Sequence, residues 1–537
     1  MDGKRNLADQ SQDETQRPRL EQTVASLAQV FTNERIWIVL AVLTATLIVG
    51  IYSRTHQYPA YGAGLFLSIA EEILARGYRL PVQIPGYTAN GIPFAYPPLG
   101  FYLSAVFLDL GVDPITLSRV FPGFITILTV ISFYYLAREI TGSVSQAGVS
   151  AIIFAVTPTL LEWHISAGGI VRALAFLFTV TGLYCGMQLF KYSQRQWLAP
   201  AFLLFGFTLL THPSYAVFFG ASYLLMWIFF DHSFKGLAMG ALVAISGFVI
   251  ISPWLAYTIS VHGIETYMAA ASTHGGLGKP YSFFEILSLL GKPIAAGNTM
   301  SFWYLLTLLG SGYLVACRRF FLPVWFLSSL LLLGDPRFAF VSGTIVMGLW
   351  ITVPVDTVTD SDSQQVVQWS LRVAVASVLV FSVILGGTYV AGTPFHGGTS
   401  QPAFIDDEDV TAMKWVNEEV PINANFVVLG DAAEWFPYLT DRTMLIGPWG
   451  AEWKSSAAYL HHLRTYRQLS RCHTETCLTK QLHQSSIQPD YVYIPKGNYT
   501  VRGAPKRQQP QMRRSLVQSN TYRLVYENRG VMVFRVR

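Results

Sequence analysis

The sequence predicts a polytopic α-helical membrane protein with a C-terminal α/β domain, and three observations support that class. Of the 537 residues, 52% are hydrophobic and 13% are charged, whereas soluble domains are about 25% charged. Long apolar runs recur through residues 36–390. Beyond residue 391, acidic residues and short β-like runs follow. This composition argues against an entirely soluble protein and excludes a disordered chain or a collagen-like repeat.

The predicted membrane spans are apolar runs of about 17 to 25 residues, the length that crosses a bilayer as a helix. Counting them, including some that are short or interrupted, gives about eleven. They cover residues 36–53, 120–136, 144–161, 173–190, 197–210, 216–230, 236–259, 302–316, 320–333, 338–353 and 373–390. Because residues 1–35 are polar and lack the apolar core of a signal peptide, we expect the first run to remain as an anchor.

Basic residues predict the orientation of the spans, because lysine and arginine are enriched in the short loops on the cytoplasmic side of the membrane. They fall in the N-terminal tail and in alternate loops, at Lys4, Arg5, Arg17, Arg19, Arg35, Arg138, Lys191, Arg195, Lys235, Arg318, Arg319 and Arg372. We therefore expect residues 1–35 to be a cytoplasmic tail and residues 36–391 to form a membrane domain with a large first external loop, residues 54–119. Residues 392–537 would then lie on the extracytoplasmic face of the plasma membrane.

The C-terminal region, residues 392–537, predicts one α/β domain large enough to bury its own core. Strands are expected at residues 425–429, 491–494 and 522–536, the last interrupted by Asn528 and Gly530, and helices at residues 410–418 and 455–469. Cys472 and Cys477 form a C-x4-C pair, which suits a disulfide in an oxidising compartment. The alternative, a metal site, would need more ligands than His473 supplies.

The first external loop contains an amphipathic stretch, residues 65–75, predicted to be a helix lying along the membrane surface. Glu71 and Glu72 lie on it, and carboxylates at this depth are costly unless solvated or used. They are therefore candidate catalytic residues, and the alternative is a solvated interfacial face. Pro97 and Pro98 are expected to begin a further helix over residues 100–110.

Other charged side chains are expected near the same membrane face. The segment from Glu162 to Arg172 also holds His164 and two glycines, and could form an anion or metal site; the alternative is a capped turn whose arginine reaches the interface. His212, between two spans, is a substrate or metal candidate or else a satisfied turn residue.

Two further cations could bind phosphate. Lys279 follows glycines in the second long loop, residues 260–301, where backbone N–H groups can approach phosphate oxygens. Arg337 begins the tenth span, where a guanidinium can bind a lipid phosphate with two hydrogen bonds or serve only as a headgroup anchor.

Several short motifs together resemble the GT-C class of membrane glycosyltransferases, which includes protein O-mannosyltransferases, the lipid A aminoarabinose transferase and the catalytic subunit of oligosaccharyltransferase. The segment Gly77-Tyr-Arg-Leu-Pro81 followed by Tyr96-Pro-Pro-Leu-Gly100 is similar to the first-loop pattern of that class. Further similar segments are Leu117-Ser-Arg119, Leu209-Leu-Thr-His-Pro213, Met413-Lys-Trp415, Gly430-Asp431, Glu434-Trp435 and Thr440-Asp-Arg442. The resemblance covers most of residues 36–537.

The resemblance implies transfer of a sugar from a polyprenyl-phosphate-linked donor to a cell-surface glycan, lipid or protein acceptor. It implies a carboxylate that activates the acceptor or positions a divalent metal, Mg or Mn. Glu71 and Glu72 are the candidates, and Arg337, Lys279, Arg172 and Arg119 are the candidate phosphate ligands. The class usually carries its acidic residue near positions 61–64, yet no Asp or Glu occurs between Arg35 and Glu71.

Two other functions remain open from the sequence. A lipid-linked sugar transporter or flippase would need ionisable residues within the spans and inverted repeats, and neither is evident in the sequence. A catalytically inactive scaffold of the same class is favoured by the missing early acidic residue. The basic residues are those of the cytoplasmic tail, the loops and the C-terminus, so they do not indicate nucleic-acid binding.

Overall fold

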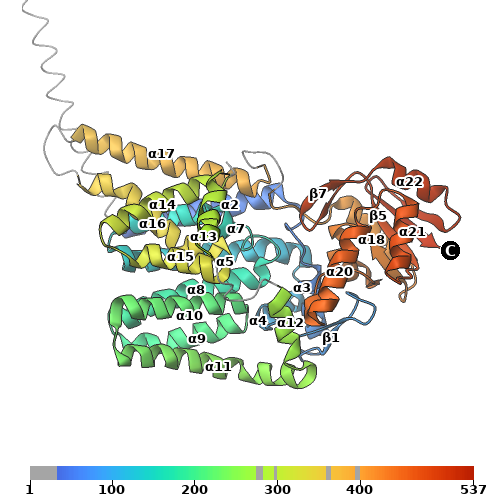
Figure 1. Ribbon diagram of the computed structural model, residues 1–537, viewed down its shortest axis with the longest axis horizontal. Helices are drawn as coiled ribbons and strands as arrows, with labels where there is room; N and C mark the ends of the chain where they lie inside the picture. Colours follow the sequence, from blue (N-terminus) through green and yellow to red (C-terminus); the bar gives the residue numbers. More distant parts are fainter. Residues whose placement is uncertain (1–32, 274–281, 296–298, 358–364, 394–399) are drawn as a thin grey trace, which may run out of the picture.

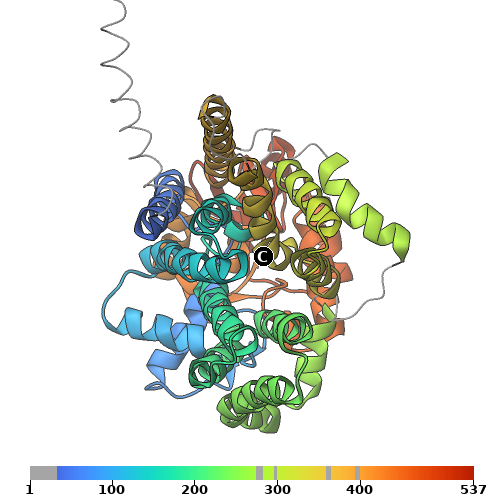
Figure 2. The same ribbon diagram turned by 90° about the vertical axis from the view of Figure 1, so that its left-hand side faces the viewer.

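The computed structural model describes residues 33–273, 282–295, 299–357, 365–393 and 400–537. A bundle of helices occupies one end of the molecule and the C-terminal α/β domain the other (Figure 1). Figure 2 shows the bundle end-on, with the C-terminal domain behind it. The tail residues Lys4, Arg5, Arg17 and Arg19 and the phosphate candidate Lys279 lie outside the described residues.

Each of the eleven apolar runs forms helix in the described structure. Those long and apolar enough to cross a membrane, seven among the described residues, are α2 (Glu34–Thr55), α5 (Pro114–Thr141), α8 (Gly169–Phe190), α10 (Pro213–Met226) with its continuation η2 (Trp227–Asp231), α11 (Phe234–His262), α16 (Pro336–Thr357) and α17 (Gln365–Val390). The shorter ones are α6 (Val144–Val156), α9 (Leu198–Leu209), α14 (Ser301–Ala316) and α15 (Phe321–Leu333). The run at 144–161 breaks at Thr157, because Pro158 cannot donate a helical hydrogen bond and begins the one-turn helix α7 (Pro158–Leu161).

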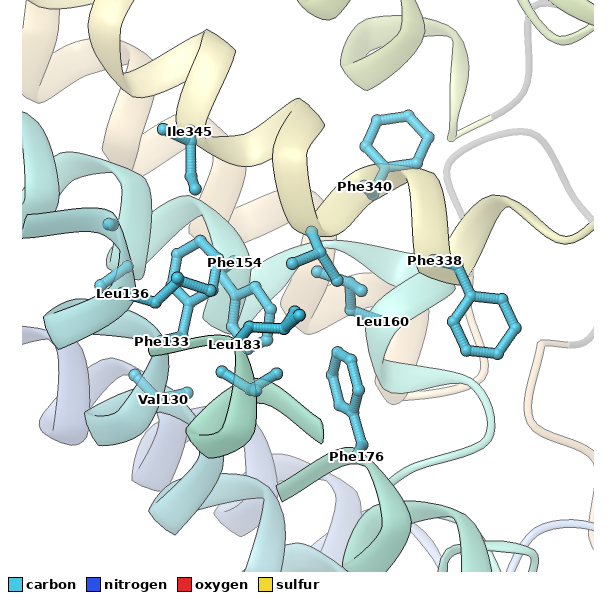
Figure 3. Close-up of a cluster of buried hydrophobic side chains, with 14 of the residues drawn as sticks. Val130, Phe133, Leu136, Phe154, Leu160, Phe176, Leu183, Phe338, Phe340 and Ile345 are labelled. Atoms are coloured by element: carbon cyan, nitrogen blue, oxygen red, sulfur yellow. The ribbon is translucent and has the colours of Figure 1, made fainter. Parts of the chain in front are cut away.

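The helices α5, α6, α8 and α16 meet in a buried apolar cluster (Figure 3). Phe133 and Phe154 stack with ring centroids 3.9 Å apart, and Phe154 stacks on Phe176 at 5.7 Å. In lipid such packing replaces the hydrophobic effect as the main attraction, so close approach matters. Gly148 provides it between α2 and α6, because a Cβ there would lie 2.3 Å from the Trp37 ring.

The basic loops lie at the end of the bundle away from the C-terminal domain (Figure 1). α8 begins beside the C-terminal domain and ends before Lys191, while α17 begins at the distant end near Arg372 and runs back toward the domain. This is the separation on which the predicted orientation rests.

The C-terminal domain contains a five-stranded mixed sheet in the order β4-β3-β5-β9-β8. The predicted strands correspond to β3 (Asn425–Val428), β5 (Tyr491–Pro495), β8 (Tyr522–Glu527) and β9 (Val531–Val536), and the predicted helices to α18 (Asp407–Glu419) and α20 (Ser456–Leu469). The elements that were not predicted are short: η4 (Asp431–Glu434), α19 (Phe436–Thr440), β4 (Thr443–Met444), η5 (Ala451–Trp453), α21 (Glu475–Gln484), β6 (Asn498–Val501), β7 (Ala504–Arg507) and α22 (Pro510–Val517).

The first loop, residues 54–119, joins α2 to α5 and lies between the bundle and the C-terminal domain (Figure 1). It forms α3 (Gly64–Ala75), the two-stranded sheet β1 (Gln83–Ile84) and β2 (Ile92–Pro93), and α4 (Leu99–Asp109). The expectation that the apolar face of α3 lies against the membrane is not supported by its contacts. Its apolar face, including Ile69 and Ile73, is buried in a cluster shared with the C-terminal domain, because α3 packs between α4 and α19.

Cys472 and Cys477 form a disulfide with a Cα–Cα distance of 5.5 Å and a sequence separation of 5. Closing so short a loop is expected to stabilise the folded domain by about 2 kcal/mol through the unfolded chain. The double variant Cys472→Ser/Cys477→Ser should therefore lower the unfolding temperature of the purified protein, and reducing agent should not lower it further. An unchanged melting temperature would show that the bridge contributes nothing to stability.

Candidate functional site

The candidate site lies where the bundle meets the C-terminal domain, and Arg337 in the first turn of α16 is its centre. Its Nη2 atom pairs with Asp335 Oδ2 at 2.8 Å, and the Arg337 backbone N–H donates to Asp335 Oδ1 at 3.0 Å. The guanidinium carbon lies 5.5 Å from the Tyr215 ring centroid and 5.1 Å from that of Phe338. Only 12% of the Arg337 side chain is exposed, so the charge is held among aromatic rings.

Arg337 keeps two donors available. Its Nε and Nη1 atoms are buried and have no hydrogen-bond partner among the described residues. A buried donor without an acceptor costs about 1–3 kcal/mol, and more when it is charged. Such groups in a folded protein call for an explanation such as a ligand or a catalytic role, and charged guanidinium N–H groups are strong donors to phosphate oxygens.

Tyr215, at the start of α10, is held against Arg337 by His164. The Tyr215 hydroxyl donates to His164 Nε2 at 2.6 Å, and His164 Nδ1 donates to the Leu160 carbonyl. Complete burial lowers the pKa of His164 to about 3, so the ring is neutral. The expectation that His164 is a substrate or metal ligand is therefore not supported by its contacts, because both ring nitrogens are already used.

Arg172 is the second cation of the site. Arg172 lies in the first turn of α8. Its guanidinium carbon lies 5.0 Å from the ring centroid of Trp163, which is in the turn that precedes α8. The Tyr96 hydroxyl is buried, which raises its pKa, and the positive charges of Arg172 and Arg337 both act on it in the opposite direction. The ring of His212 lies 5.9 Å from Tyr96. The predicted residues Arg172, His212 and Arg337 are thus brought together around one tyrosine.

Glu162 supplies a carboxylate next to the arginines. Burial raises its pKa, while a hydrogen bond from Tyr61 and the charge of Arg337 lower it and the charge of Asp335 raises it further. The Tyr61 hydroxyl donates to Glu162 Oε1 at 3.0 Å. A partly buried carboxylate with a raised pKa is a stronger base than an exposed one and is suited to general-base catalysis. Glu162 is therefore the better placed of the predicted carboxylates.

Tyr61 is oriented by its neighbours. Its ring stacks on Trp163 with centroids 4.6 Å apart and an interplanar angle of 20°. Its backbone has a φ of 60°, a left-handed conformation that costs a non-glycine residue about 1–2 kcal/mol. Its N–H donates to the Pro402 carbonyl at 2.8 Å. The surrounding structure thus offsets the strain and holds the hydroxyl on Glu162.

The C-terminal domain adds Glu452 and Trp453, which the sequence analysis did not predict. The Trp453 ring lies 5.6 Å from Tyr96, and the negative charge of Glu452 acts on the same tyrosine. These residues follow Gly450, which has a φ of 76° and whose absent Cβ would lie 2.0 Å from Ile92 Cδ1 in the first loop. In the sequence, the only indication of a role for Glu452 was its position between Trp449 and Trp453. The folded structure is needed to place it near Tyr96.

Three predicted site residues lie elsewhere. Glu71 accepts a hydrogen bond from Tyr438 at 2.9 Å, and burial raises its pKa, while Glu72 pairs with Arg76 at 3.2 Å. Glu71 is thus engaged by α19, which carries Tyr438, and Glu72 by α3 itself. Arg119 Nη1 donates to the Gln57 carbonyl at 3.0 Å. None of these contacts joins the predicted catalytic pair to the predicted phosphate ligands Arg172 and Arg337.

The side chains offer no ready metal centre. Within the described ranges, no group of three or more His, Cys, Asp or Glu residues is placed to hold an ion. In particular, Glu162, His164 and His212 do not form a ligand set, since His164 is occupied at both ring nitrogens. In the part of the chain that the structure describes, a Mg or Mn ion therefore has no set of three protein ligands.

Comparisons with known proteins agree with this architecture. A family model described as dolichyl-phosphate-mannose-protein mannosyltransferase matches residues 95–257. Among solved structures, the Archaeoglobus fulgidus oligosaccharyltransferase aligns with a TM-score of 0.55 and 13% identity, over 87% of this chain and 70% of that one. ArnT from Cupriavidus metallidurans, bound to undecaprenyl phosphate, aligns with a TM-score of 0.51 and 13% identity, over 93% of this chain and 97% of that one. No curated protein sequence matches the chain.

A third structure, the arabinofuranosyltransferase AftD from Mycobacteria, aligns with a TM-score of 0.58 and 13% identity. The alignment covers 94% of this chain and 40% of AftD. At such identities the likeness concerns the fold. The resemblance read from the sequence is confirmed: the chain has the fold of the GT-C class of membrane glycosyltransferases. It combines a polytopic helical membrane domain with a C-terminal sheet domain.

Proposed function

We propose that the protein transfers a sugar from a polyprenyl-phosphate-linked donor to a cell-surface glycan, lipid or protein, at the extracytoplasmic face of the plasma membrane. The observation that carries the proposal is the pair of buried, unpartnered N–H groups of Arg337 at the start of a membrane helix. A lipid phosphate is an anion of the right shape, and it reaches this depth because its chain lies in the bilayer.

The proposed reaction is a direct displacement at the anomeric carbon. The acceptor oxygen or nitrogen bonds to that carbon as the bond from the carbon to the phosphate oxygen breaks, and the electron pair leaves with the polyprenyl phosphate. Arg337, assisted by Arg172, stabilises the charge that grows on the departing phosphate. Glu162 accepts the proton of the acceptor. The hydrogen bond from Tyr61 favours the ionised form of Glu162 and orients it.

Proteins with the same fold support the class of donor. The Cupriavidus metallidurans structure contains undecaprenyl phosphate, and an Archaeoglobus fulgidus oligosaccharyltransferase structure contains dolichol-phosphate with an inhibitory peptide. These ligands share a phosphate on a polyisoprenoid chain. The sugar and the acceptor differ between such proteins, so the proposal names the donor class only.

The test uses purified protein in liposomes with synthetic polyprenyl-phosphate mannose or polyprenyl-phosphate arabinofuranose and a membrane extract as the acceptor source. We expect release of polyprenyl phosphate together with labelled product, and loss of both in Arg337→Ala. Movement of the intact donor between leaflets without release would instead identify a flippase. Neither movement nor release with any donor, together with co-purification of other glycan-assembly enzymes, would identify a scaffold.

A further inference from the structure

The carboxylate of Glu434 joins the C-terminal domain to the first loop. Its two oxygens accept the backbone N–H groups of Gly64 at 3.0 Å and Leu65 at 2.9 Å, the first two residues of α3. The residue that precedes α3, Ala63, makes no side-chain cap. Glu434 therefore caps a helix that is 370 residues away in the sequence, and its negative charge suits the positive end of that helix.

The fit around Glu434 is close. A Cβ on Gly62 would lie 2.0 Å from Glu434 Oε2, and one on Gly64 would lie 2.5 Å from the Glu434 carbonyl oxygen. That carbonyl accepts a hydrogen bond from the Tyr87 hydroxyl at 2.9 Å. Glu434 is 3% exposed. The backbone of residues 62–65 is thus fixed directly on the carboxylate.

Tyr61 precedes this fixed segment, and its hydroxyl is the hydrogen-bond donor to Glu162. Because Gly62 is bonded directly to Tyr61, a shift of Gly62 would displace the Tyr61 backbone, which is held in the left-handed region. We propose that Glu434 is a positioning residue of the transfer site, which holds the first loop so that Tyr61 orients Glu162. This inference rests on the proposed function, since it assigns Glu162 a role in transfer.

Burying the Glu434 carboxylate costs free energy, which a role in positioning the first loop would explain. Burial raises the pKa of Glu434 to about 7, the two N–H groups lower it, and the charge of Asp431 raises it again. A cap made by a small side chain at Ala63 would avoid that cost, whereas the cap from the C-terminal domain ties two parts of the site together.

The effect on Glu162 can be measured because the groups around that carboxyl are known. They are Tyr61 in the first loop, Asp335 and Arg337 at the start of α16, and Tyr389 on α17. Tyr61 donates to the ionised form and so lowers the pKa of Glu162. Removing the hydroxyl should raise that pKa, and the acidic limb of the pH profile of transfer should move to higher pH.

The experiment compares pH profiles of transfer for the full chain in liposomes. Tyr61→Phe is expected to move the acidic limb upward by about one pH unit, the value of a hydrogen bond to a charged group. Glu434→Ala should move it in the same direction, Glu434→Gln by less because one acceptor oxygen remains, and the double variant Glu434→Ala/Tyr61→Phe no further than Tyr61→Phe. Gly62→Ala, which displaces the carboxylate from the other side, should act like Glu434→Ala.

Asp431→Asn is the matched control. Asp431 lies in the same short helix, but its carboxylate accepts from the N–H groups of Arg502 and Gly503 and from the Tyr466 hydroxyl, all within the C-terminal domain. It can lower stability without moving the acidic limb. If Glu434→Ala and Gly62→Ala leave the limb where it is in the wild type, or if Asp431→Asn moves it equally, the positioning role is overturned.

A second readout does not require activity. The infrared carboxyl band that disappears in Glu162→Gln reports the titration of Glu162 directly. The pH midpoint of this titration should shift upward in Glu434→Ala but not in Asp431→Asn. A wild-type protein that transfers no sugar would contradict the proposed function alone. In that case an upward shift of the titration midpoint would still support the positional link, and an unchanged midpoint would overturn it.

Discussion

Replacing Arg337 with alanine is expected to reduce sugar transfer about 10²–10³-fold, the usual effect of removing one donor to a developing negative charge. The reason is that Nε and Nη1 have no protein acceptor in the part of the chain that the structure describes and lie in a poorly solvated setting where such contacts are strong. The measurement is the rate of polyprenyl phosphate release in liposomes at saturating acceptor.

Two variants accompany that experiment. Arg337→Lys keeps the positive charge but not the fork of the guanidinium, and it should recover only a small part of the rate. Arg319→Ala removes an exposed arginine from the loop before α15, at the opposite end of the bundle, and should transfer at the wild-type rate. Equal rates for Arg337→Ala and Arg319→Ala would remove Arg337 from the mechanism.

Replacing Glu162 with glutamine is expected to lower transfer about 10²–10⁴-fold, the contribution of a positioned general base. Glutamine keeps the size and the hydrogen bond from Tyr61 but cannot take the acceptor proton. The pH profile should also lose its acidic limb, because the pKa that is raised by burial no longer belongs to an ionisable group.

The same substitution at Glu72 separates two assignments of the base. Glu72 pairs with Arg76 at 3.2 Å on α3, so Glu72→Gln is expected to change the rate less than about twofold, as surface ion pairs contribute little. If instead Glu72→Gln abolishes transfer and Glu162→Gln does not, the prediction made from the sequence is right and the assignment from the contacts is wrong.

The membrane helices could be predicted because their signal is local. An apolar run of sufficient length has few alternatives in a bilayer, and each of the eleven runs is helical. The surface placement of α3 could not be predicted, because an amphipathic helix fits a membrane surface and a protein surface equally well. Its partners, α4 and α19, are fixed only when the C-terminal domain docks.

The site was predictable only in part. Arg172, Glu162 and Arg337 were recognised because charges at the ends of membrane helices are rare and therefore informative. Glu434 and Glu452 lie in a domain of ordinary composition, where charge alone does not mark a glutamate, and the likeness of Glu434-Trp435 to a family segment did not indicate a role for the side chain. Glu71 and Glu72 were favoured because they lie on the predicted surface helix of the first external loop, but a place in the loop does not fix what a side chain contacts.

The cap on α3 also has a consequence for how the protein is made. During synthesis the first loop emerges long before residues 431–454, so the amides of Gly64 and Leu65 lack their acceptor until the ribosome has nearly finished. The arginines and Glu162 are then present, but Tyr61 is not yet fixed. A chain at that stage would meet lipid-linked sugars without a completed site, and we expect activity to begin only when the last quarter of the protein has folded.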